Sequence, residues 1–451
     1  MNKKKVLIAN RGEIAVRVVR ACKELELQTV LAASEADLDS LGAQLADEVV
    51  CIGPAMAAES YLRIEKVIEA AQETGADAIH PGYGFLAENP GLPEACEKND
   101  ITFIGPNSDV MSQLGDKISA RALAKKTGVP MAEGSAGLNS FSDVQAEVAK
   151  AGYPVIFKAA AGGGGRGMRI VREDKELKAA FDMASNEAQS AFGDSRLFVE
   201  RYIENARHVE VQIVGDKYGN VVHIGMRDCS PQRRHQKVIE EAPPYHLSDA
   251  LGERILESAV ALTSSIGYSG AGTVEFLVDK DREAFYFMEV NTRIQVEHPV
   301  SEEISGIDLI KEQIRVGFGE RLSVAQKDIG FSGHAIECRI TAEDPRDDFF
   351  PSPGCIETFT APSGDHVRVD THCYSGYVVT PYYDSMIAKL ITTGSDRAEA
   401  IANMKSALDG FVIEGIETNI PFLQFLIDQK DFITGDIDIK WIERDVMKDF
   451  A

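Results

Sequence analysis

A glycine-rich segment at residues 159–168 has the composition of a backbone that must approach another molecule closely. It reads Ala-Ala-Ala-Gly-Gly-Gly-Gly-Arg-Gly-Met and joins two apolar stretches, Tyr-Pro-Val-Ile-Phe and Met-Arg-Ile-Val. Flexible linkers have polar flanks, so this context predicts a strand, a loop and a second strand. Glycine permits positive φ and close approach, and the N–H groups of such a loop bind phosphate. With Lys158 as an added positive charge, the segment predicts a site for nucleotide phosphates.

Other glycine motifs fit the sequence less well. Gly162, Gly164 and Gly167 spell Gly-x-Gly-x-x-Gly, but a dinucleotide-binding turn opens a helix, whereas this segment opens a strand. A Walker loop needs a lysine where Met168 stands. The first strand-to-helix turn, Ala-Asn-Arg-Gly-Glu-Ile-Ala, has one glycine, so a nicotinamide dehydrogenase is a minor alternative.

A pair of glutamates lies within a second predicted hairpin. Two apolar strands flank the turn Asp-Lys-Asp-Arg-Glu, and folding about Arg282 places Glu275 opposite Glu289. Two buried carboxylates need a partner. One interpretation is salt bridges to buried arginines. The other is a hard cation such as Mg²⁺, with Asn291 as a further oxygen ligand and nucleotide phosphates completing the set.

A third stretch gathers positive charge in an acidic protein. It contains Arg227, Arg233, Arg234, His235 and Lys237. A solvated basic face would explain these residues, but a pocket for a small anion fits better because guanidinium groups bind planar anions through paired hydrogen bonds.

Composition excludes several classes of function. The 451 residues carry a formal net charge of −24, with 44% hydrophobic and 26% charged residues, which is typical of a soluble globular protein and disfavours nucleic acid as a partner. The seven cysteines include no Cys-x-x-Cys pair, so neither a disulfide framework nor a zinc site is expected. The apolar run near the N-terminus is too short for a signal peptide, and no run suits a membrane span. We therefore expect a cytoplasmic protein with no membrane partner.

The elements that must position these residues follow from periodicity. In the first 105 residues, strands alternate with helices, which predicts a parallel, doubly wound sheet. The expected strands are 5–10, 29–34, 76–82 and 101–106, and the expected helices are 12–25, 64–75 and about 88–98. A helix at 116–128 and a Gly/Ser-rich join at 134–142 follow. Beyond a mixed stretch to about residue 330, we expect short strands over 334–393, a helix at about 397–410 and a polar, mixed C-terminus.

Nine motifs in one order give the chain a family resemblance. It resembles biotin carboxylase, an enzyme of the ATP-grasp superfamily, from about residue 4 to about residue 440. The motifs are ANRGEIA, HPGYGF, GGGGRGM, RHVE, RDCS followed after Pro231 by QRRHQK, MEVNTRIQVEHPV, IECRITAEDP, PSPG and PYYDSMIAKL. The resemblance implies an α/β fold, α+β in parts, with three domains. These are a Rossmann-like N-terminal domain over 1–113, an ATP-grasp domain over 114–330 with a mobile glycine-rich lid at about 131–203, and a C-terminal biotin carboxylase domain over 331–451.

The resemblance also assigns site residues. ATP would be bound by Lys117, Lys158, Gly163, Gly164, Gly165, Glu200, Arg201, Ile203, His208, Gln232 and His235. Mg²⁺ or Mn²⁺ would be held by Glu275, Glu289 and Asn291, and bicarbonate by Lys237, Arg293, Gln295 and Val296. Glu297 would be the catalytic base, Lys237 and Arg293 would gather negative charge, and Arg339 would face biotin with Tyr83 nearby.

The implied chemistry suits these residue types. Bicarbonate is a poor nucleophile, so a carboxylate base must remove its proton as it attacks the γ-phosphate of ATP. Nearby cations stabilise the charge of the transferring phosphoryl group. The product, carboxyphosphate, would release CO₂ and phosphate, and that phosphate would deprotonate the ureido nitrogen of biotin while Arg339 stabilises the oxygen.

The resemblance implies partners as well. Biotin would be presented by a separate biotin carboxyl carrier protein, and carboxyltransferase subunits and a second copy of the chain are expected. Neither Met404-Lys405 nor Met447-Lys448 is followed by methionine, so no covalent biotin is expected on this chain. Acetyl-CoA is the first expectation for the final acceptor, with propionyl-CoA, pyruvate and other 2-oxo acids left open. Remote alternatives are another ATP-grasp ligase and a non-catalytic carboxylase subunit.

A few positions depart from the usual family pattern. They are Gly42, Ala87, Ala160, Ala161, Arg201 and Pro231. None removes a charged catalytic group, although Arg201 puts the contact to adenine in some doubt and the two alanines could stiffen the lid.

Overall fold

The N-terminal region of the computed structural model contains a parallel five-stranded sheet in the order β3-β2-β1-β4-β5. The structure describes residues 3–135, 137–138, 140–159 and 168–450. The strands are β1 (Lys5–Ile8), β2 (Gln28–Ala33), β3 (Glu48–Cys51), β4 (Ala78–His80) and β5 (Thr102–Phe103), and the helices are α1 (Gly12–Glu24), α2 (Leu41–Leu45), α3 (Ile64–Thr74) and α4 (Gly91–Lys98). All four strand pairings are parallel, which confirms the predicted doubly wound sheet.

Local sequence explains this region. The three apolar residues Val6, Leu7 and Ile8 of β1 are fully buried, as expected for a strand covered on both faces. Helix α1 buries Ile14 and Val18 against the sheet. Helix α3 ends where Gly75 takes φ 65°, a left-handed conformation that glycine adopts without steric cost.

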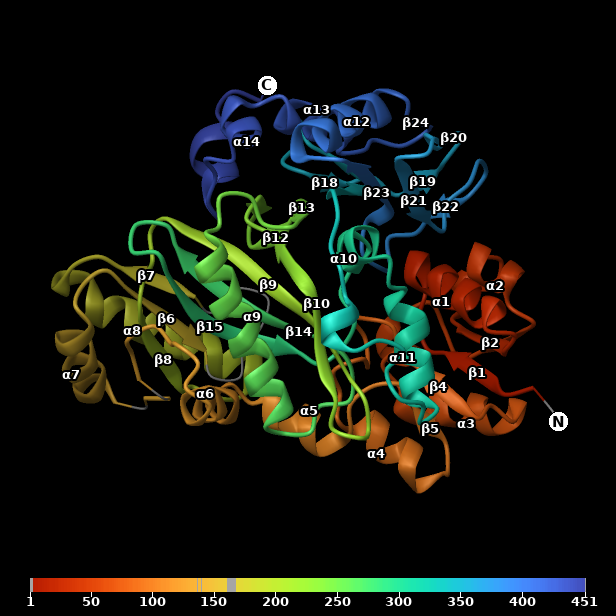
Figure 1. The fold of residues 1–451 in the computed structure, drawn as a ribbon, viewed down its shortest axis with the longest axis horizontal. Helices are drawn as coiled ribbons and strands as arrows, with labels where there is room; N and C mark the ends of the chain where they lie inside the picture. The colour runs from red at the N-terminus through yellow and green to blue at the C-terminus, as the bar shows by residue number, and fades with distance from the viewer. Residues whose placement is uncertain (1–2, 136, 139, 160–167, 451) are drawn as a thin grey trace.

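An eight-stranded antiparallel sheet forms the centre of the molecule and extends into the C-terminal region (Figure 1). Its order is β15-β14-β9-β10-β13-β16-β23-β21. The bounds are β9 (Ala206–Gly215), β10 (Val221–Asp228), β13 (Ile239–Ala242), β14 (Gly270–Asp279), β15 (Ala284–Asn291), β16 (His334–Thr341), β21 (Val367–Thr371) and β23 (Met386–Gly394). Pairing of β13 with β16 makes one sheet across residue 330, where a domain boundary was predicted.

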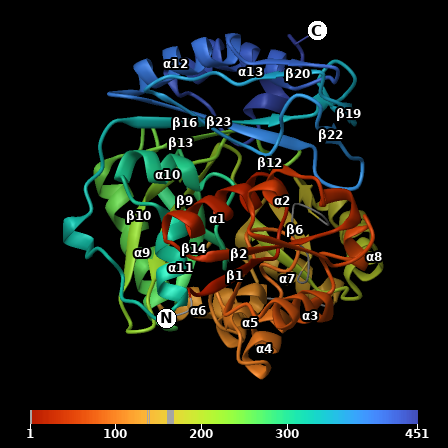
Figure 2. The same cartoon turned by 90° about the vertical axis from the view of Figure 1, so that its right-hand side faces the viewer.

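Helices cover both ends of this sheet. Helix α9 (Asp249–Ser264) packs Ile255 and Leu262 against β9 and β14. Helices α10 (His298–Ser305) and α11 (Leu309–Gly317) follow β15, and Val300 of α10 contacts Ala242 of β13. At the other end, α12 (Arg397–Asp409) and α13 (Ile420–Ile427) lie over β16 and β23 (Figure 2).

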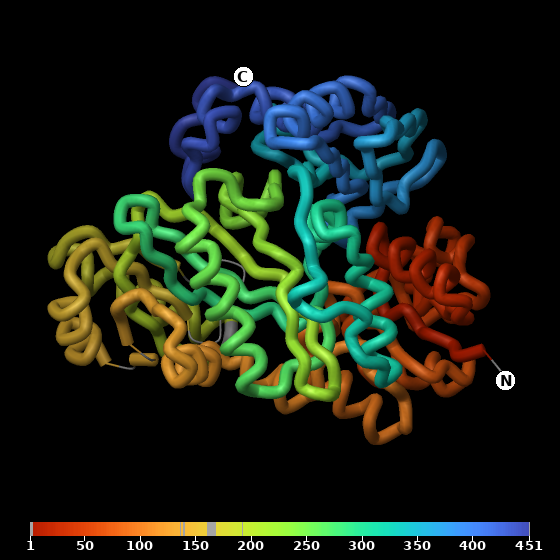
Figure 3. The backbone as a smooth tube through the Cα atoms, viewed as in Figure 1, coloured from red at the N-terminus to blue at the C-terminus, as the bar shows by residue number. Residues whose placement is uncertain are grey.

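The segment predicted to be the lid forms a lobe of its own at the left of the tube drawing (Figure 3). It contains the three-stranded sheet β7-β6-β8 and two helices. Strands β6 (Val155–Ala159) and β7 (Arg169–Val171) pair antiparallel, as predicted for the glycine hairpin, although Gly163, Gly164 and Gly165 lie outside the described residues. The other elements of the lobe are α7 (Phe141–Ala151), α8 (Asp174–Phe192) and β8 (Leu197–Arg201), and the helices α5 (Ser108–Gly115) and α6 (Lys117–Lys126) precede it in the chain.

The C-terminal region is more ordered than the expected polar, mixed segment. Beyond α12, apolar residues of α13 and α14 (Lys430–Thr434) pack into a core that includes Phe422, Phe432 and Trp441, each at most 1% exposed. A π-helix (Ile442–Val446) follows. Short strands complete the region as predicted: β17 (Glu343–Asp344), β18 (Phe350–Pro351), β19 (Gly354–Cys355), β20 (Thr358–Thr360), β22 (Val378–Val379) and β24 (Val412–Glu414). No helix in the described part of the chain has the length and apolar character needed to cross a membrane.

Candidate active site

A cleft of about 1140 Å³ collects nearly all of the predicted site residues. Its walls come from α6, the lobe of β6 to β8, the central sheet and β16. The predicted residues that line it are Lys117, Lys158, Glu200, Arg201, Ile203, His208, Gln232, His235, Lys237, Glu275, Glu289, Asn291, Arg293, Gln295, Val296, Glu297 and Arg339. Residues that are as much as 222 positions apart in the sequence, Lys117 and Arg339, therefore share one cavity.

Three glutamates form a row across the central sheet, and two of them, Glu275 and Glu289, line the cleft. Glu275 of β14 lies opposite Glu210 of β9 on one side and opposite Glu289 of β15 on the other. The predicted opposition of Glu275 and Glu289 is thus confirmed. Burial and the charge of Glu275 raise the pKa of Glu289. Carboxylates that repel each other in this way fit a divalent cation, which would relieve the repulsion.

The alternative of buried salt bridges to arginine does not describe this pair. Within the described residues, no arginine lies within 4.0 Å of either Glu275 or Glu289. Glu275 is contacted by His208 at 3.1 Å and by Lys237 at 3.3 Å, while Glu289 lies 4.0 Å from Lys117. Asn291 donates its amide to Glu275 at 2.9 Å and accepts from Arg293 at 3.0 Å, so its oxygen serves an arginine here and its role as a metal ligand remains a prediction.

The predicted base sits between two cations. Glu297 Oε1 lies 2.5 Å from Lys237 Nζ, and Glu297 Oε2 accepts from Arg339 Nη2 at 2.9 Å. Burial would raise the pKa of this carboxyl, but Lys237, Arg339 and the more distant Arg227 outweigh burial and hold the pKa well below its ordinary value. Glu297 is therefore ionised near neutral pH, which is the form that a general base requires.

The residues predicted to bind bicarbonate are held in place by neighbours. Arg293 Nε lies 3.0 Å from Glu88 of the N-terminal region. Gln295 donates to Glu275 at 2.8 Å. The carbonyl of Val296 accepts from Lys389, a fully buried lysine of β23, at 2.9 Å. The segment predicted to bind bicarbonate is thus fixed by all three regions of the chain.

The remaining predicted nucleotide residues line the same cleft. Glu200 pairs with Lys158 at 2.6 Å and also with Arg121. Burial lowers the pKa of Lys117. Arg201 donates to the hydroxyl of Tyr286 at 2.8 Å, so the arginine that departs from the family pattern is held by a neighbouring aromatic residue.

His208 and Gln232 contact each other beside the row of Glu210, Glu275 and Glu289. Gln232 lies on β11 (Gln232–Arg233), and its amide is 2.7 Å from Nδ1 of His208. Lys237 lies on the paired strand β12 (Gln236–Lys237), so a two-stranded hairpin presents Gln232 and Lys237 to the cleft together. His235 occupies the tight turn between them with φ 64°.

The basic cluster does not form the single anion pocket that its composition suggested. Arg227 is fully buried, and its guanidinium contacts Glu210 at 2.5 Å and Gln295 at 2.8 Å behind the cleft. Arg234 is exposed and pairs with Asp348. Only part of the cluster, Arg233, His235 and Lys237, lines the cleft. The sequence alone could not tell which of these residues is buried, which is exposed and which lines the cleft. Neighbouring residues of a strand face opposite sides, so nearness along the chain does not place them together.

Tyr83 lies outside the residues that line the cleft. Its hydroxyl donates to Glu13, and Glu13 also lies 3.1 Å from Lys389. Tyr83 is thereby connected to the lysine that holds Val296, but its contact with biotin stays a prediction.

Sequence reasoning missed five charged residues that hold the predicted site residues. They are Glu88, Arg121, Glu210, Glu240 and Lys389. The alternation His208, Glu210, Gln212 in β9 could have revealed Glu210, because residues two apart share one face of a strand. Arg121 lies one turn after Lys117 on α6, which is also a usable signal. Nothing local marks Glu240 or Lys389.

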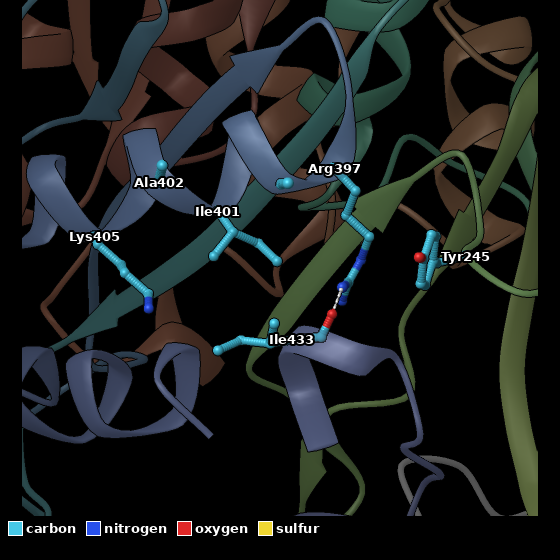
Figure 4. Close-up of a pocket in the computed structure, with 7 residues that line it drawn as sticks. Tyr245, Arg397, Ile401, Ala402, Lys405 and Ile433 are labelled. Carbon is cyan, nitrogen blue, oxygen red and sulfur yellow. Dashed lines mark hydrogen bonds between the residues drawn. The ribbon is translucent and has the colours of Figure 1, made fainter. Parts of the chain in front are cut away.

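A second, smaller cavity lies away from this site. It measures about 240 Å³, between α12, α14 and Tyr245 (Figure 4). Arg397 at its edge is occupied by Glu241 at 2.6 Å and by the carbonyl of Ile433 at 2.9 Å. This arrangement is a buried ion pair with both partners satisfied.

Comparison with known proteins identifies the family. Family models match in chain order: "Biotin carboxylase, N-terminal domain" over residues 2–111, "Carbamoyl-phosphate synthase L chain, ATP binding domain" over 116–325 and "Biotin carboxylase C-terminal domain" over 337–444. Biotin carboxylase 1 of Bacillus subtilis is 52% identical over 98% of this chain and 99% of its own length. One of the pyruvate carboxylase subunits of Methanothermobacter thermautotrophicus is 51% identical over 97% of this chain and 89% of its own length.

A solved structure shares the fold throughout. The biotin carboxylase domain dimer of Hydrogenobacter thermophilus 2-oxoglutarate carboxylase, in complex with MgADP, ADP and bicarbonate, superposes with a TM-score of 0.94. It is 47% identical and covers 99% of both chains. The N-terminal parallel sheet and the antiparallel ATP-grasp sheet are therefore family features. Family models match nearly the whole length of the chain, and a curated relative is 52% identical to it. The chain therefore belongs to the biotin carboxylases, which are ATP-dependent ligases.

Proposed function

We propose that this chain uses ATP and bicarbonate to carboxylate biotin on a separate carrier protein, and that the residues of the cleft act as the family resemblance implies. The observation that carries the proposal is the position of Glu297 between Lys237 and Arg339 in a cleft that Lys117 and Lys158 also line. A base for bicarbonate and cations for phosphate then face one cavity.

Glu297 would begin the chemistry as the general base. It takes the proton of bicarbonate as a bicarbonate oxygen forms a bond to the γ-phosphorus of ATP and the bond to ADP breaks. Lys237 and Arg293 stabilise the negative charge that gathers at this point. Glu275 and Glu289 fit Mg²⁺, which when bound neutralises phosphate charge during the transfer.

The second step takes place on biotin. Carboxyphosphate separates into CO₂ and phosphate, the phosphate accepts the proton of the ureido N–H, and the nitrogen then forms a bond to CO₂. Arg339 Nη2 and Nε are occupied by Glu297 and Glu240, whereas no described residue accepts a hydrogen bond from Nη1. Nη1 is therefore the donor that would stabilise the negative ureido oxygen of biotin.

We propose that the partners are a biotin carboxyl carrier protein, carboxyltransferase subunits and a second copy of this chain. A biotin carboxyl carrier protein is expected as a partner because biotin attached to a docked carrier has a high effective concentration at the site. The solved relative from Hydrogenobacter is a dimer of its domain, which supports the last.

Acetyl-CoA is the proposed final acceptor, as the family resemblance implies. The near-equal identity of a pyruvate carboxylase subunit favours pyruvate as the second candidate, and a 2-oxoglutarate carboxylase domain is similar as well. Isolating this chain with its native partners and assaying acetyl-CoA, pyruvate and 2-oxoglutarate with the isolated complex distinguishes these acceptors. Transfer to a 2-oxo acid and not to acetyl-CoA would overturn the first choice.

The experiment on the reaction itself compares two rates in one preparation of the Arg339→Ala variant. Bicarbonate-dependent ATP cleavage without biotin reports the first step, and carboxybiotin formation reports both steps. We expect the ratio of carboxybiotin formation to ATP cleavage to fall about 10- to 100-fold, because the lost donor is a charged hydrogen-bonding group. An equal fall of both rates would show that Arg339 does not serve biotin.

A further inference from the structure

Behind Arg339, a row of charged side chains crosses the central sheet on one face. Glu240 of β13 lies opposite Glu337 of β16, and Arg339 of β16 lies opposite Lys389 of β23. Glu240 is 0% exposed and is absent from the residues that line the cleft, whereas Arg339 lines it. Glu240 therefore contacts the arginine from the protein side and not from the substrate side.

The contact between Glu240 and Arg339 fixes the plane of the guanidinium. One oxygen, Glu240 Oε1, is 2.6 Å from Nε and 2.6 Å from Nη2 of Arg339. The same Nη2 reaches Glu297 at 2.9 Å. A planar group held at Nε and Nη2 has its third nitrogen, Nη1, directed by geometry alone.

Glu337 explains how a second carboxyl can lie beside Glu240. Both oxygens of Glu337 are buried and without a hydrogen-bond partner among the described residues. Burial of an ionised carboxylate in such a position has a high free-energy cost. Burial raises the pKa of Glu337 well above its ordinary value, whereas the pKa of Glu240, which has Arg339 as a partner, is raised to about 7. A proton shared by these neighbours therefore resides on Glu337 in preference to Glu240, and Glu240 is ionised above about pH 7.

We propose that Glu240 is a positioning residue for the biotin half of the reaction, acting through Arg339 by holding its guanidinium so that Nη1 faces the cleft. The inference rests on the proposed role of Arg339. It predicts that the charge of Glu240 matters for the step on biotin and little for the cleavage of ATP, although Glu240 touches no substrate.

The chain offers a matched control in the next residue. Glu241 follows Glu240 on β13, so its side chain faces the other side of the sheet. It is equally buried and equally paired, to Arg397 at 2.6 Å and His334 at 2.9 Å, beside the small cavity of Figure 4. A change at Glu241 removes a buried charge from the same strand without touching Arg339.

The experiment measures carboxybiotin formation and bicarbonate-dependent ATP cleavage for Glu240→Gln, Glu241→Gln, Arg339→Ala and the double variant Glu240→Gln with Arg339→Ala. Free biotin serves as substrate, and the assay is run at about pH 8 so that Glu240 is ionised in the parent. For Glu240→Gln we expect KM for biotin to rise about 10-fold while KM for ATP stays unchanged, because a neutral hydrogen bond replaces a charge-assisted one. For Glu241→Gln we expect a lower Tm and an unchanged ratio of the two rates.

The variants separate the possible failures. If Arg339→Ala lowers both rates equally, the proposed role of Arg339 fails. If Arg339→Ala is selective for biotin but Glu240→Gln is not, or if Glu241→Gln raises KM for biotin as much, the positioning role of Glu240 is wrong. In the double variant, Glu240→Gln adds no further loss to that of Arg339→Ala when it acts through the arginine. Additive losses would mean that Glu240 acts independently, which contradicts the proposal.

Discussion

Lys237 Nζ lies 2.5 Å from Glu297 Oε1 and also 2.5 Å from the buried Glu210 Oε2. One ammonium group thus joins the expected base to the row of Glu210, Glu275 and Glu289 on the central sheet. This geometry keeps Glu297 ionised, and it places the positive charge where the proposed reaction would bring bicarbonate and phosphate together.

Replacing Glu297 with Gln should reduce bicarbonate-dependent ATP cleavage about 10²- to 10⁴-fold, the usual effect of losing a general base. Binding of ATP, measured by calorimetry, should change little, because Glu297 is proposed to act on bicarbonate. Glu303→Gln, an exposed glutamate of helix α10, which Glu297 directly precedes, is the control and should be close to the parent. A Glu297 variant that keeps more than half of the parent rate would exclude this residue as the base.

The double variant Glu275→Gln and Glu289→Gln should need a higher Mg²⁺ concentration for half-maximal rate. The two carboxylates oppose each other across β14 and β15, and each change removes one negative ligand. Glu283→Gln, an exposed residue between the same two strands, serves as the control. An unchanged Mg²⁺ requirement would show that the pair has a structural role only.

Asp370 should make stability depend on pH in the acid range. Burial opposes its ionisation, but Arg368 at 2.8 Å and Lys389 at 3.9 Å lower its pKa to about 2. A carboxyl whose pKa is lower in the folded state stabilises that state above its unfolded pKa of about 4, by roughly 2 kcal/mol, and loses this effect as the pH falls toward 2.

Urea unfolding tests this dependence. Asp370→Asn should lower the free energy of unfolding at pH 7, and the difference from the parent should shrink below about pH 4. The exposed Asp365→Asn is the control. A difference that stays constant down to the lowest pH at which both proteins fold would disprove the link to ionisation.

The purified chain should carry no covalent biotin and should use free biotin weakly. Met404 is fully buried in α12 and Lys405 pairs with Asp428, so this Met-Lys pair does not lie on an exposed β-turn. Addition of a biotinylated carrier protein should raise the rate through effective concentration. Intact mass and an avidin blot check the first expectation, and a biotin-sized mass increment would refute it.

Much of the architecture could be predicted because its signals are local. The alternation of strands and helices before residue 105 and the two hairpins depend on periods of two and 3.6 residues that are visible in short windows. The opposition of Glu275 and Glu289 followed from the position of a single turn. The resemblance supplied the remaining site residues. Apart from Tyr83, the predicted residues that the structure describes line one cleft.

The parts that could not be predicted depend on distant pairing. Strands β13 and β16 are about 95 residues apart along the chain, and only their register places Glu240 opposite Glu337 and next to Arg339. Arg227 was grouped with the predicted anion pocket because residue type does not indicate which face of a strand a side chain occupies. The buried Trp441 shows the same limit, since its core is built from segments far apart in the sequence.

The most direct test of the account follows an oxygen atom. Bicarbonate labelled with oxygen-18 is supplied with ATP, Mg²⁺ and biotinylated carrier, and the released phosphate is analysed by mass spectrometry. If a bicarbonate oxygen attacks the γ-phosphorus, one labelled oxygen should appear in the phosphate for each carboxybiotin formed. Carboxybiotin formed with unlabelled phosphate, or phosphate released at the same rate without bicarbonate, would contradict the proposed reaction.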